Sequence, residues 1–497
     1  MQISTATITR KFCALDDCQK MLLWIFVLLC YRLLIIGTDH LAVFFDEAYY
    51  YYWAQAPDWG YYSKPPVVAW FIAVSSSVFG ATDLGVKFFS PLLYSACALC
   101  IFHLARELFN ARVALLSGVI FTTTPIVGFN SLFITTDAPL FFFWALTTLL
   151  FVKALNSSSW LLWLALGIST GLGMLSKYTF VMLPFGLFVY LFFVGKQQVL
   201  LSMRCLVAIA ACLALFATNI WWNMQNDFIS FSHTQEIAKL DRKLFNFDHL
   251  FEFLLSQCLI FGAVWSVYLI TKSRHLTKTL WQDERFVLLV WITLPILGII
   301  ASQAFLSRAF VNWAGPFVIG ASVTAAVVLV NVKRSVVLLG VVSNLVLLSL
   351  FYHWPQILSA LDVEQSRKNS PYYRIAGWRE ASLQVQPLLD QYSDSIVASN
   401  SRELLSYVSF YNDLSPAKIA FLDSDEEYIA NHFDLVANLT MMSGKSGYIV
   451  LSKTPLSQNE KGFFTEIRLL QHLNVEYNQH ISRNIYVYGA KGFNGYE

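Results

Sequence analysis

Two acidic residues stand side by side shortly after the first long apolar run of the chain. Asp46 and Glu47 follow a hydrophobic stretch, and Lys64 comes about twenty residues later, before two prolines. A carboxylate can take a proton from a hydroxyl group, and a lysine beside backbone N–H groups can hold a phosphate. Acid, aromatic and basic side chains therefore meet within Phe44–Trp70, which predicts one half of an active site.

Each of these residues also has a structural explanation. Acidic residues favour the N-terminus of any helix, and an aromatic run such as Tyr49–Trp53 is typical of a belt at the membrane interface. A lysine at the interface often extends its ammonium group toward water. Pro65 and Pro66 favour a helix start just after Lys64. Spacing alone leaves the structural and the chemical explanations open.

Further candidates lie at the ends of other apolar runs. Asp137, with Pro139 two residues later, is either a helix cap or a third carboxylate on the same face of the membrane. Lys177 interrupts two apolar runs, and Arg308 lies near Asn312 at the mouth of a later run. Ionisable groups near membrane spans are costly, so they are candidates for function, and arginine suits bidentate contact with phosphate.

Composition indicates a chain that lies mostly in lipid. It is 56% hydrophobic and 13% charged, whereas a soluble protein carries about 25% charged residues. The net charge of +2 gives no reason to expect a nucleic acid partner. Cys13 and Cys18 lack the spacing of a zinc site, and most other cysteines lie in apolar runs, so no metal site is predicted.

Eleven apolar segments approach the roughly 20 residues that a helix needs to cross a membrane. They are 21–37, 84–105, 113–129, 137–154, 160–176, 178–195, 203–222, 249–270, 286–304, 309–330 and 335–352. Pro66–Phe79 is shorter and fits a helix at the interface. Lysines and arginines gather in alternate connections, which places residues 1–20 in the cytoplasm and the loop 38–83 on the opposite side.

The tail from residue 353 onward has a different composition, with more polar and charged residues. Short β-like runs alternate there with helical patterns, which predicts an α/β domain over 353–497, outside the membrane. The expected strands are Ser395–Ala398, Ile419–Leu422, Tyr448–Leu451 and Asn484–Tyr488. The predicted organisation is therefore an N-terminal segment 1–20, a transmembrane domain 21–352 with a catalytic first loop 38–83, and the domain 353–497.

Several motifs resemble those of membrane glycosyltransferases that use a polyprenyl-phosphate-linked sugar. They are DEAYYYYWAQ, GYYSKPPVVAW, TTDAPLFFFWAL, LSKYTFVMLP, WWNMQNDFISF and NWAGP, in the expected order over most of residues 40–320. This superfamily includes protein O-mannosyltransferases and the bacterial enzymes that add aminoarabinose or galacturonic acid to lipopolysaccharide. The resemblance implies the GT-C fold, here an α-helical polytopic membrane protein of about 11 transmembrane helices with a C-terminal soluble α/β domain. It also implies the bacterial inner membrane, with the first loop and the C-terminal domain in the periplasm.

The resemblance assigns roles residue by residue. Asp46 matches the catalytic acidic position, Asp137 matches the second acidic position, and Glu47 follows the first acid as in many members, so these three are the expected catalytic residues. Lys64 matches a lysine that faces the donor phosphate in the aminoarabinose branch. The other expected contacts are Arg308 and Lys177 to the phosphate, and Tyr49, Tyr61, Tyr62 and Asn312 to the substrate.

The function expected from these roles is sugar transfer from a polyprenyl-phosphate donor to lipid A or lipopolysaccharide core. Asp46 would act as general base, and one displacement would invert the anomeric centre. A protein acceptor with the same donor is an alternative, and a polytopic lipid or sugar transporter is an alternative from another class. No cofactor is expected to be required, because the donor has no nucleotide diphosphate. A divalent cation is compatible with the site, although Ser63 stands where the aminoarabinose branch tends to carry an acid.

Overall fold

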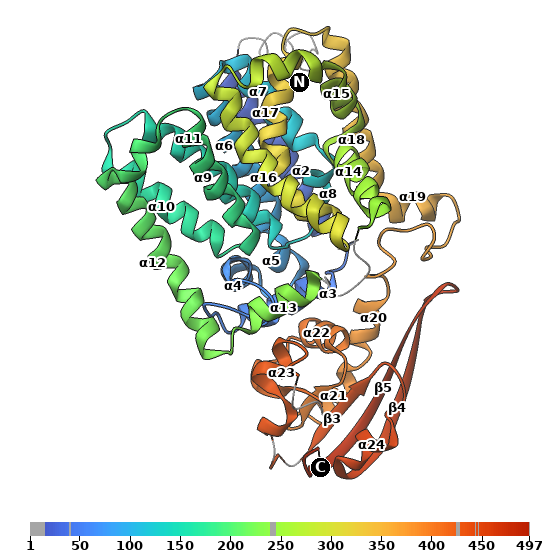
Figure 1. Cartoon of the computed structure of the whole chain (residues 1–497). Helices are drawn as coiled ribbons and strands as arrows, with labels where there is room; N and C mark the ends of the chain where they lie inside the picture. The colour runs from blue at the N-terminus through green and yellow to red at the C-terminus, as the bar shows by residue number, and fades with distance from the viewer. Residues whose placement is uncertain are drawn as a thin grey trace. The chain divides into compact units, whose positions relative to one another are not determined.

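The chain divides into two compact units in a computed structural model (Figure 1). The structure describes residues 15–38, 41–238, 245–423, 428–442, 444–445 and 447–496. The first unit contains Met1–Leu34 and Phe89–Tyr352, and the second contains Ile35–Phe88 and His353–Glu497. Most of the predicted N-terminal segment 1–20 lies outside the described residues.

The first unit is built from helices joined by short connections. Its helices are α2 (Asp17–Gly37, which continues into the second unit), α6 (Phe89–Leu108), α7 (Ala111–Thr123), α8 (Pro125–Asn130), α9 (Asp137–Leu155), α10 (Trp160–Met174), α11 (Met182–Phe193), α12 (Met203–Gln225), α13 (Ile229–Ala238), α14 (Phe247–Phe261), α15 (Ala263–Leu280), α16 (Glu284–Leu306), α17 (Phe317–Leu329) and α18 (Arg334–Tyr352), with 3₁₀ turns η1 (Tyr178–Val181), η2 (Gln197–Leu201) and η3 (Val311–Ala314).

Every predicted span contains helix, but the count of eleven spans is not confirmed. Among the described residues, six helices are long and apolar enough to cross a membrane, or seven if one bent pair is a single span. The six are α2, α6 together with the short α5 (Asp83–Lys87) before it, α9, α12, α16 and α18. The remaining predicted spans are shorter helices or pairs of helices with a break between them.

The breaks fall at residues that disfavour a continuous helix. The predicted span 249–270 is two helices, α14 and α15, which meet at 109° around Gly262. Gly262 has φ +115°, a conformation that other residues rarely adopt. The predicted span 113–129 is likewise divided into α7 and α8 at Pro125, whose ring prevents the preceding turn from continuing as helix.

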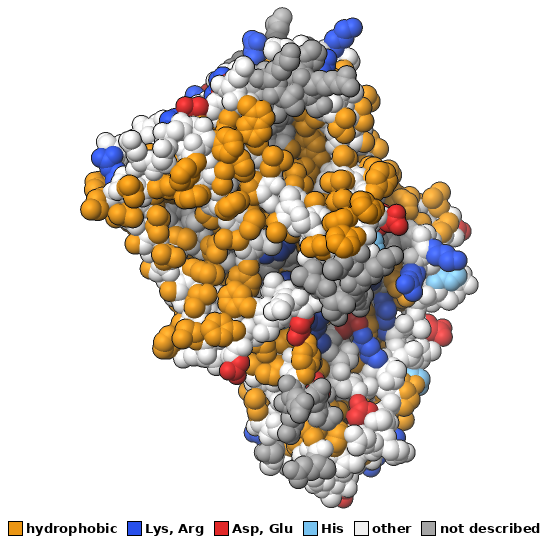
Figure 2. Space-filling view, viewed as in Figure 1, with side chains coloured by type: hydrophobic (Ala, Val, Ile, Leu, Met, Phe, Trp, Pro, Cys, Tyr) orange, Lys and Arg blue, Asp and Glu red, His pale blue; other side chains and the backbone are white. Residues whose placement is uncertain are grey.

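Large apolar side chains cover much of the outer surface of the first unit. Figure 2 shows them spread over the face that carries α10, α12 and α16. The exposed side chains on these helices include Trp160, Leu161, Leu164, Leu206, Ile209, Leu213 and Leu294. In water such a surface would be costly, whereas lipid tails are as apolar as leucine.

Glycines allow close approach between neighbouring helices of the first unit. A Cβ atom at Gly186 of α11 would lie 1.9 Å from the carbonyl oxygen of Trp291 in α16. A Cβ atom at Gly167 of α10 would lie 2.2 Å from the carbonyl oxygen of Ala208 in α12. Small residues at such crossings let backbones pack closely, which is the usual means of helix association in membranes.

The second unit combines the first loop with the C-terminal part of the chain. From the first loop it contains the helices α3 (Phe45–Ala54), α4 (Val67–Phe79) and α5. From the C-terminal part it contains α19 (Trp354–Ala360), α20 (Trp378–Leu383), α21 (Gln386–Gln391), α22 (Arg402–Tyr411), α23 (His432–Ala437) and α24 (Gln458–Gly462), with 3₁₀ turns η4 (Pro416–Lys418) and η5 (Leu439–Met442). The loop 38–83, which the sequence predicts as part of the transmembrane domain, belongs in the structure to the same unit as residues 353–497.

A five-stranded mixed sheet forms the core of the C-terminal part. Its order is β2-β1-β3-β5-β4, with strands β1 (Ile396–Ser399), β2 (Ile419–Phe421), β3 (Tyr448–Ser452), β4 (Phe464–Asn478) and β5 (Ile481–Phe493). The pairs β1–β2 and β1–β3 are parallel, and β5 runs antiparallel to both β3 and β4. β1, β2 and β3 are buried along their whole length, which explains why they read as short apolar runs.

Candidate active site

Glu47 holds the start of α3 in place. Its carboxylate accepts a hydrogen bond from the backbone N–H of Phe44 at 2.8 Å, which caps the first turn. The ammonium group of Lys87 lies 3.7 Å from the same carboxylate, and both side chains are buried. Lys87 also donates to the carbonyl oxygens of Leu41 and Ala42, at 2.7 and 3.0 Å. These contacts fix the backbone that presents Asp46, the next residue toward the N-terminus.

The aromatic run of α3 is buried in the second unit, so it is not a membrane-interface belt. Tyr49, Tyr51, Tyr52 and Trp53 are all buried. Tyr51 meets Phe410 of α22 edge-on at 5.2 Å, and its hydroxyl donates to the Asp413 carboxylate at 3.0 Å. Burial raises the pKa of Tyr51 to about 12. The sequence-based alternative of an interfacial belt is therefore wrong for this run.

The same packing encloses three residues predicted to bind substrate. Tyr49 accepts a short hydrogen bond from the backbone N–H of His432. Tyr61 is stacked on Trp53 at 4.5 Å, and its hydroxyl donates to the Trp53 carbonyl oxygen at 3.1 Å. Tyr62 is buried with its hydroxyl 3.5 Å from that of Tyr428. Tyr49 belongs to α3, Tyr61 stacks on it, and all three rings are buried.

Asp46 lies partly buried beside charges of both signs. Burial raises the pKa of its carboxyl, while the positive charges of Arg402 and then Lys64 oppose that rise, and Glu403 adds to it. The charge of Lys64 thus acts on Asp46. The structure adds Arg402, from α22, which the sequence analysis did not single out. A carboxylate with a raised pKa beside cations is an arrangement typical of a general base.

Lys64 is held by a local backbone turn. Its N–H donates to the Tyr61 carbonyl oxygen at 3.3 Å, and its carbonyl oxygen accepts from the Tyr61 N–H at 3.1 Å. α4 begins three residues later, at Val67, after Pro66. The predicted placement of Lys64 just before a helix start is therefore confirmed.

The first unit contains a second polar cluster, around Asp137. This carboxylate accepts from the Lys177 ammonium group at 2.7 Å and from the Asn312 amide at 2.7 Å, one partner on each oxygen. Asp137 is buried, and the Lys177 side chain is 12% exposed. Thr136 precedes α9 as its N-cap residue, so Asp137 lies in the first turn and uses its oxygens across helices rather than as a cap.

Neighbouring residues fix the position of Lys177. The hydroxyl of Tyr178 donates to the Asn219 side-chain oxygen at 3.0 Å, and its ring stacks on Phe231 at 4.8 Å. The backbone turns at Lys177 from α10 into η1, and the Phe180 N–H donates to the Lys177 carbonyl oxygen. An ammonium group has three donors, so the bond to Asp137 leaves capacity for an anionic ligand.

Arg308 does not join the Asp137 cluster. Its side chain is exposed, and its guanidinium carbon lies 5.2 Å from the centre of the Phe310 ring. Asn312, only four residues on, turns into the cluster through η3. The predicted contact of Arg308 with a donor phosphate stays a prediction.

Three residues near Asp46 were missed from the sequence. Lys87 lies inside a predicted span, and a buried charge in such a span is itself a signal of function. Arg402 and His432 lie more than 350 residues from Asp46 in the sequence, in a region without recognisable motifs. His432 packs edge-on against Trp53 and Tyr61, and burial lowers its pKa to about 3, so it is neutral at physiological pH.

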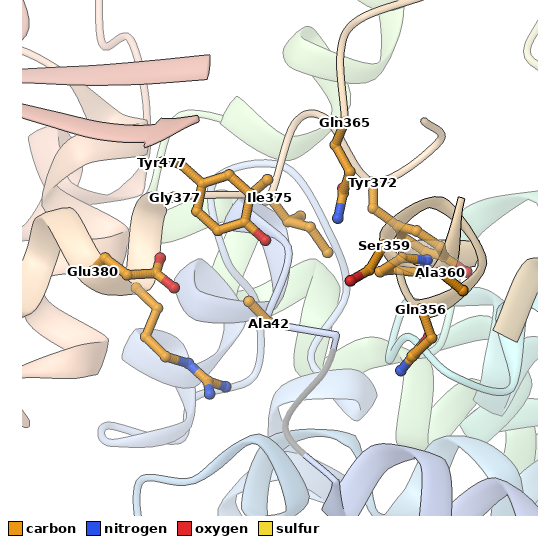
Figure 3. A pocket seen from close by; sticks show the side chains of 13 residues that line it. Ala42, Gln356, Ser359, Ala360, Gln365, Tyr372, Ile375, Gly377, Glu380 and Tyr477 are labelled. Carbon is orange, nitrogen blue, oxygen red and sulfur yellow. The ribbon is translucent and has the colours of Figure 1, made fainter. Parts of the chain in front are cut away.

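A hollow of about 580 Å³ also lies in the second unit (Figure 3), but no predicted site residue lines it. Ala42, Gln356, Tyr372, Arg379 and Tyr477 are among its walls. Arg379 forms a salt bridge with Asp83, which occupies its charge. Within the part of the chain that the structure describes, no three His, Cys, Asp or Glu side chains gather as a metal site would need.

Known proteins with similar sequences include glycosyltransferases. A family model described as dolichyl-phosphate-mannose-protein mannosyltransferase matches residues 63–222. The lipid A galacturonosyltransferase RgtD of Rhizobium johnstonii is 28% identical over 427 residues, which cover 82% of this chain and 87% of that protein. An undecaprenyl phosphate-aminoarabinose arabinosyl transferase of Pseudomonas fluorescens is 29% identical over 24% of this chain and 22% of its own length.

The fold of the chain is similar to that of a solved membrane transferase, ArnT. ArnT of Cupriavidus metallidurans, in a crystal structure with undecaprenyl phosphate bound, has a TM-score of 0.63 with 13% identity, over 94% of this chain and 98% of that one. The apo form gives a TM-score of 0.62. The chain is therefore a multi-pass membrane protein with the fold of ArnT, and its resemblance to the polyprenyl-phosphate-dependent glycosyltransferases of the GT-C superfamily is confirmed.

Proposed function

We propose that this protein transfers a sugar from a polyprenyl-phosphate donor to lipid A or lipopolysaccharide core. The observation that carries the proposal is the setting of Asp46, a partly buried carboxylate on the helix whose Phe45 and Tyr49 rings carry Arg402. The charges of Arg402 and Lys64 both act on this carboxylate. The relative RgtD acts on lipid A, and its match extends over most of both chains. The lipid A acceptor therefore has more support than a protein acceptor.

The proposed reaction is a single displacement at the anomeric carbon. Asp46 takes the proton of the acceptor hydroxyl as the acceptor oxygen forms its bond to that carbon. The bond from the anomeric carbon to the phosphate oxygen breaks, and its electron pair leaves with polyprenyl phosphate. Positive charge from Lys64 would stabilise the departing phosphate. One displacement inverts the configuration of the sugar.

Two other carboxylates have supporting roles in this proposal. Glu47 already accepts from Phe44 and faces Lys87, so we assign it to positioning α3 rather than to proton transfer. Asp137 fixes Lys177 and Asn312, and we propose that Lys177 uses its remaining donors to bind an anionic group of a substrate. Arg308 is proposed as a further phosphate contact, since its guanidinium group is exposed.

The proposed topology keeps eleven spans in the bacterial inner membrane. Here the shorter helices α7, α10, α11 and α17 and the bent pair α14–α15 cross the membrane together with the six longer helices, while α4 lies at the interface. Residues 1–20 would lie in the cytoplasm, while 38–83 and 353–497 would lie in the periplasm. Placing Asp46 in the periplasm gives it access to lipid acceptors in the outer leaflet.

The proposal needs no cofactor, because the leaving group is a single phosphate. A divalent cation near that phosphate is compatible with the mechanism but has no assigned ligands. A transporter remains the alternative from another class, and it predicts movement of a lipid without formation of a glycosidic bond.

Two linked measurements test the proposal. The first is mass spectrometry of lipid A and core from cells with and without the gene, which should show a loss of one sugar in the deletion strain. The second supplies the purified protein with polyprenyl-phosphate-linked galacturonic acid, then with the aminoarabinose donor, and with lipid A as acceptor. Formation of a glycoside with release of polyprenyl phosphate is the expected result. An unchanged lipid A and core, with glycosylation lost from envelope proteins instead, would favour the protein acceptor.

A further inference from the structure

One arginine of the C-terminal part lies over the same face of α3 that carries Asp46. The guanidinium carbon of Arg402 is 5.2 Å from the centre of the Phe45 ring and 5.3 Å from that of Tyr49. Phe45 and Tyr49 are four residues apart, and Asp46 and Tyr49 are three apart, so all three share one side of the helix. Arg402 is thus held on two rings that flank Asp46, at cation–π distance from both.

The rest of α22 holds Arg402 in this place. Ser401 caps the helix by accepting from the Leu404 N–H, and Tyr407 stacks on Trp378 at 5.1 Å. α22 then packs along α3 (Figure 1), where Phe410 meets Tyr51. The position of the guanidinium group therefore follows from a capped, buried helix and not from a surface loop.

The other charges around α3 already have partners. From α22, Glu403 forms a salt bridge with Lys453. From α5, Lys87 faces Glu47, and Asp83 forms a salt bridge with Arg379. Lys64, before α4, is the other cation that acts on Asp46. Arg402 makes no salt bridge among the residues that the structure describes.

We infer that Arg402 is a positioning residue that keeps Asp46 in the ionised form a general base requires. This inference rests on the proposed function and makes the C-terminal part of the chain a component of the catalytic site. Burial of a carboxylate favours its neutral, inactive form, and a nearby positive charge opposes this. Arginine suits the role because it stays charged at every physiological pH and stacks on aromatic rings.

The test is the pH dependence of kcat/KM for sugar transfer by the full-length protein, with polyprenyl-phosphate-linked galacturonic acid and lipid A. Arg402→Gln should move the rising limb of the profile to higher pH by about 1 unit or more, the size expected for loss of a close opposite charge. Arg402→Lys should restore most of the wild-type midpoint. Glu403→Gln should move the limb to lower pH, because it removes a negative charge that opposes ionisation of Asp46.

Lys491→Gln is the matched control, since Lys491 lies on β5 with its side chain 72% exposed and should leave the midpoint unchanged. An unshifted midpoint in Arg402→Gln would overturn the inference. If that variant does not fold, an unshifted midpoint in Glu403→Gln would overturn it instead. Should Asp46→Asn keep wild-type transfer, the proposed base itself fails. An inactive Asp46→Asn with an unshifted Arg402→Gln leaves the proposed function intact and removes only the role of Arg402.

Discussion

Two aspartates, one in each unit, have different environments although each lies in the first turn of a helix. Asp137 in the first unit has one partner on each oxygen, Lys177 and Asn312, both at 2.7 Å. In the second unit, burial raises the pKa of Asp46, and the positive charges of Arg402 and Lys64 oppose that rise. The first carboxylate is fixed by its partners, whereas the second carries a charge that its surroundings only partly stabilise.

This difference separates a structural carboxylate from a reactive one. A base must have a free oxygen to accept the proton of the acceptor hydroxyl, and both oxygens of Asp137 already accept hydrogen bonds, from Lys177 and Asn312. When two carboxylates of one protein have different environments, they usually have separate roles. The same substitution, Asp→Asn, should therefore have its larger effect on catalysis at Asp46 and its larger effect on stability at Asp137.

The largest effect is expected from Asp46→Asn. The amide cannot accept a proton from the acceptor hydroxyl, so transfer should fall by roughly 10²–10⁴, the usual contribution of a general base. Sugar transfer by the purified variant, with equal amounts of membrane-inserted protein, measures this. A fall of less than tenfold would show that Asp46 is not the reactive carboxylate of the two.

The next effect is on stability, from Asp137→Asn. Removing this charge leaves the ammonium group of Lys177 buried without compensation, which should lower the free energy of unfolding by about 3–5 kcal/mol. Denaturation in detergent, monitored by tryptophan fluorescence, measures the change. The double variant Asp137→Asn/Lys177→Met removes both charges and should recover much of the loss, which a purely local packing defect would not allow.

A smaller loss is expected from Glu47→Gln. The amide oxygen can still accept from the Phe44 N–H, and Lys87 keeps two carbonyl acceptors, so the cost should be about 1–3 kcal/mol. Transfer should stay within about tenfold of wild type, well short of the loss expected for a missing base. A loss as large as that of Asp46→Asn would make Glu47 a catalytic residue, as the sequence analysis first assigned it.

The smallest effect is a gain in stability from Asp46→Asn. Because burial raises the pKa of Asp46 in the folded state, folding favours its protonated form at low pH, and that contribution is lost as pH rises through the raised pKa. Asparagine resembles the protonated form at every pH. The unfolding free energy of the variant should therefore match wild type at low pH and exceed it at high pH. The reverse pH trend would contradict the raised pKa.

Local motifs predicted much of the site. Asp46, Lys64 and Asp137 were identified because charges at the ends of apolar runs are costly, and the start of α4 followed from Pro65 and Pro66. The boundary of the C-terminal domain and four of its five strands were visible as changes in composition and short apolar runs. These features depend on residues close together in the sequence.

Features that depend on distant contacts were not predicted. Arg402 reaches Asp46 only through the packing of α22 on α3, and no local pattern marks it. β4 was missed because most of its side chains are exposed and polar or charged residues stand between its apolar ones, so it lacks the apolar signature of a buried strand. Gly262 and Pro125 did carry local signals of helix breaks, and weighing them would have corrected the count of continuous spans.

The most direct test of the account is the rate of sugar transfer as a function of pH, in wild type and in Asp46→Asn. If Asp46 is the general base, the wild type should show a rising limb with its midpoint above the ordinary aspartate pKa, and the variant a low, flat profile. A rising limb that persists in Asp46→Asn at a wild-type rate would contradict this assignment, because the proton would then be taken by another group.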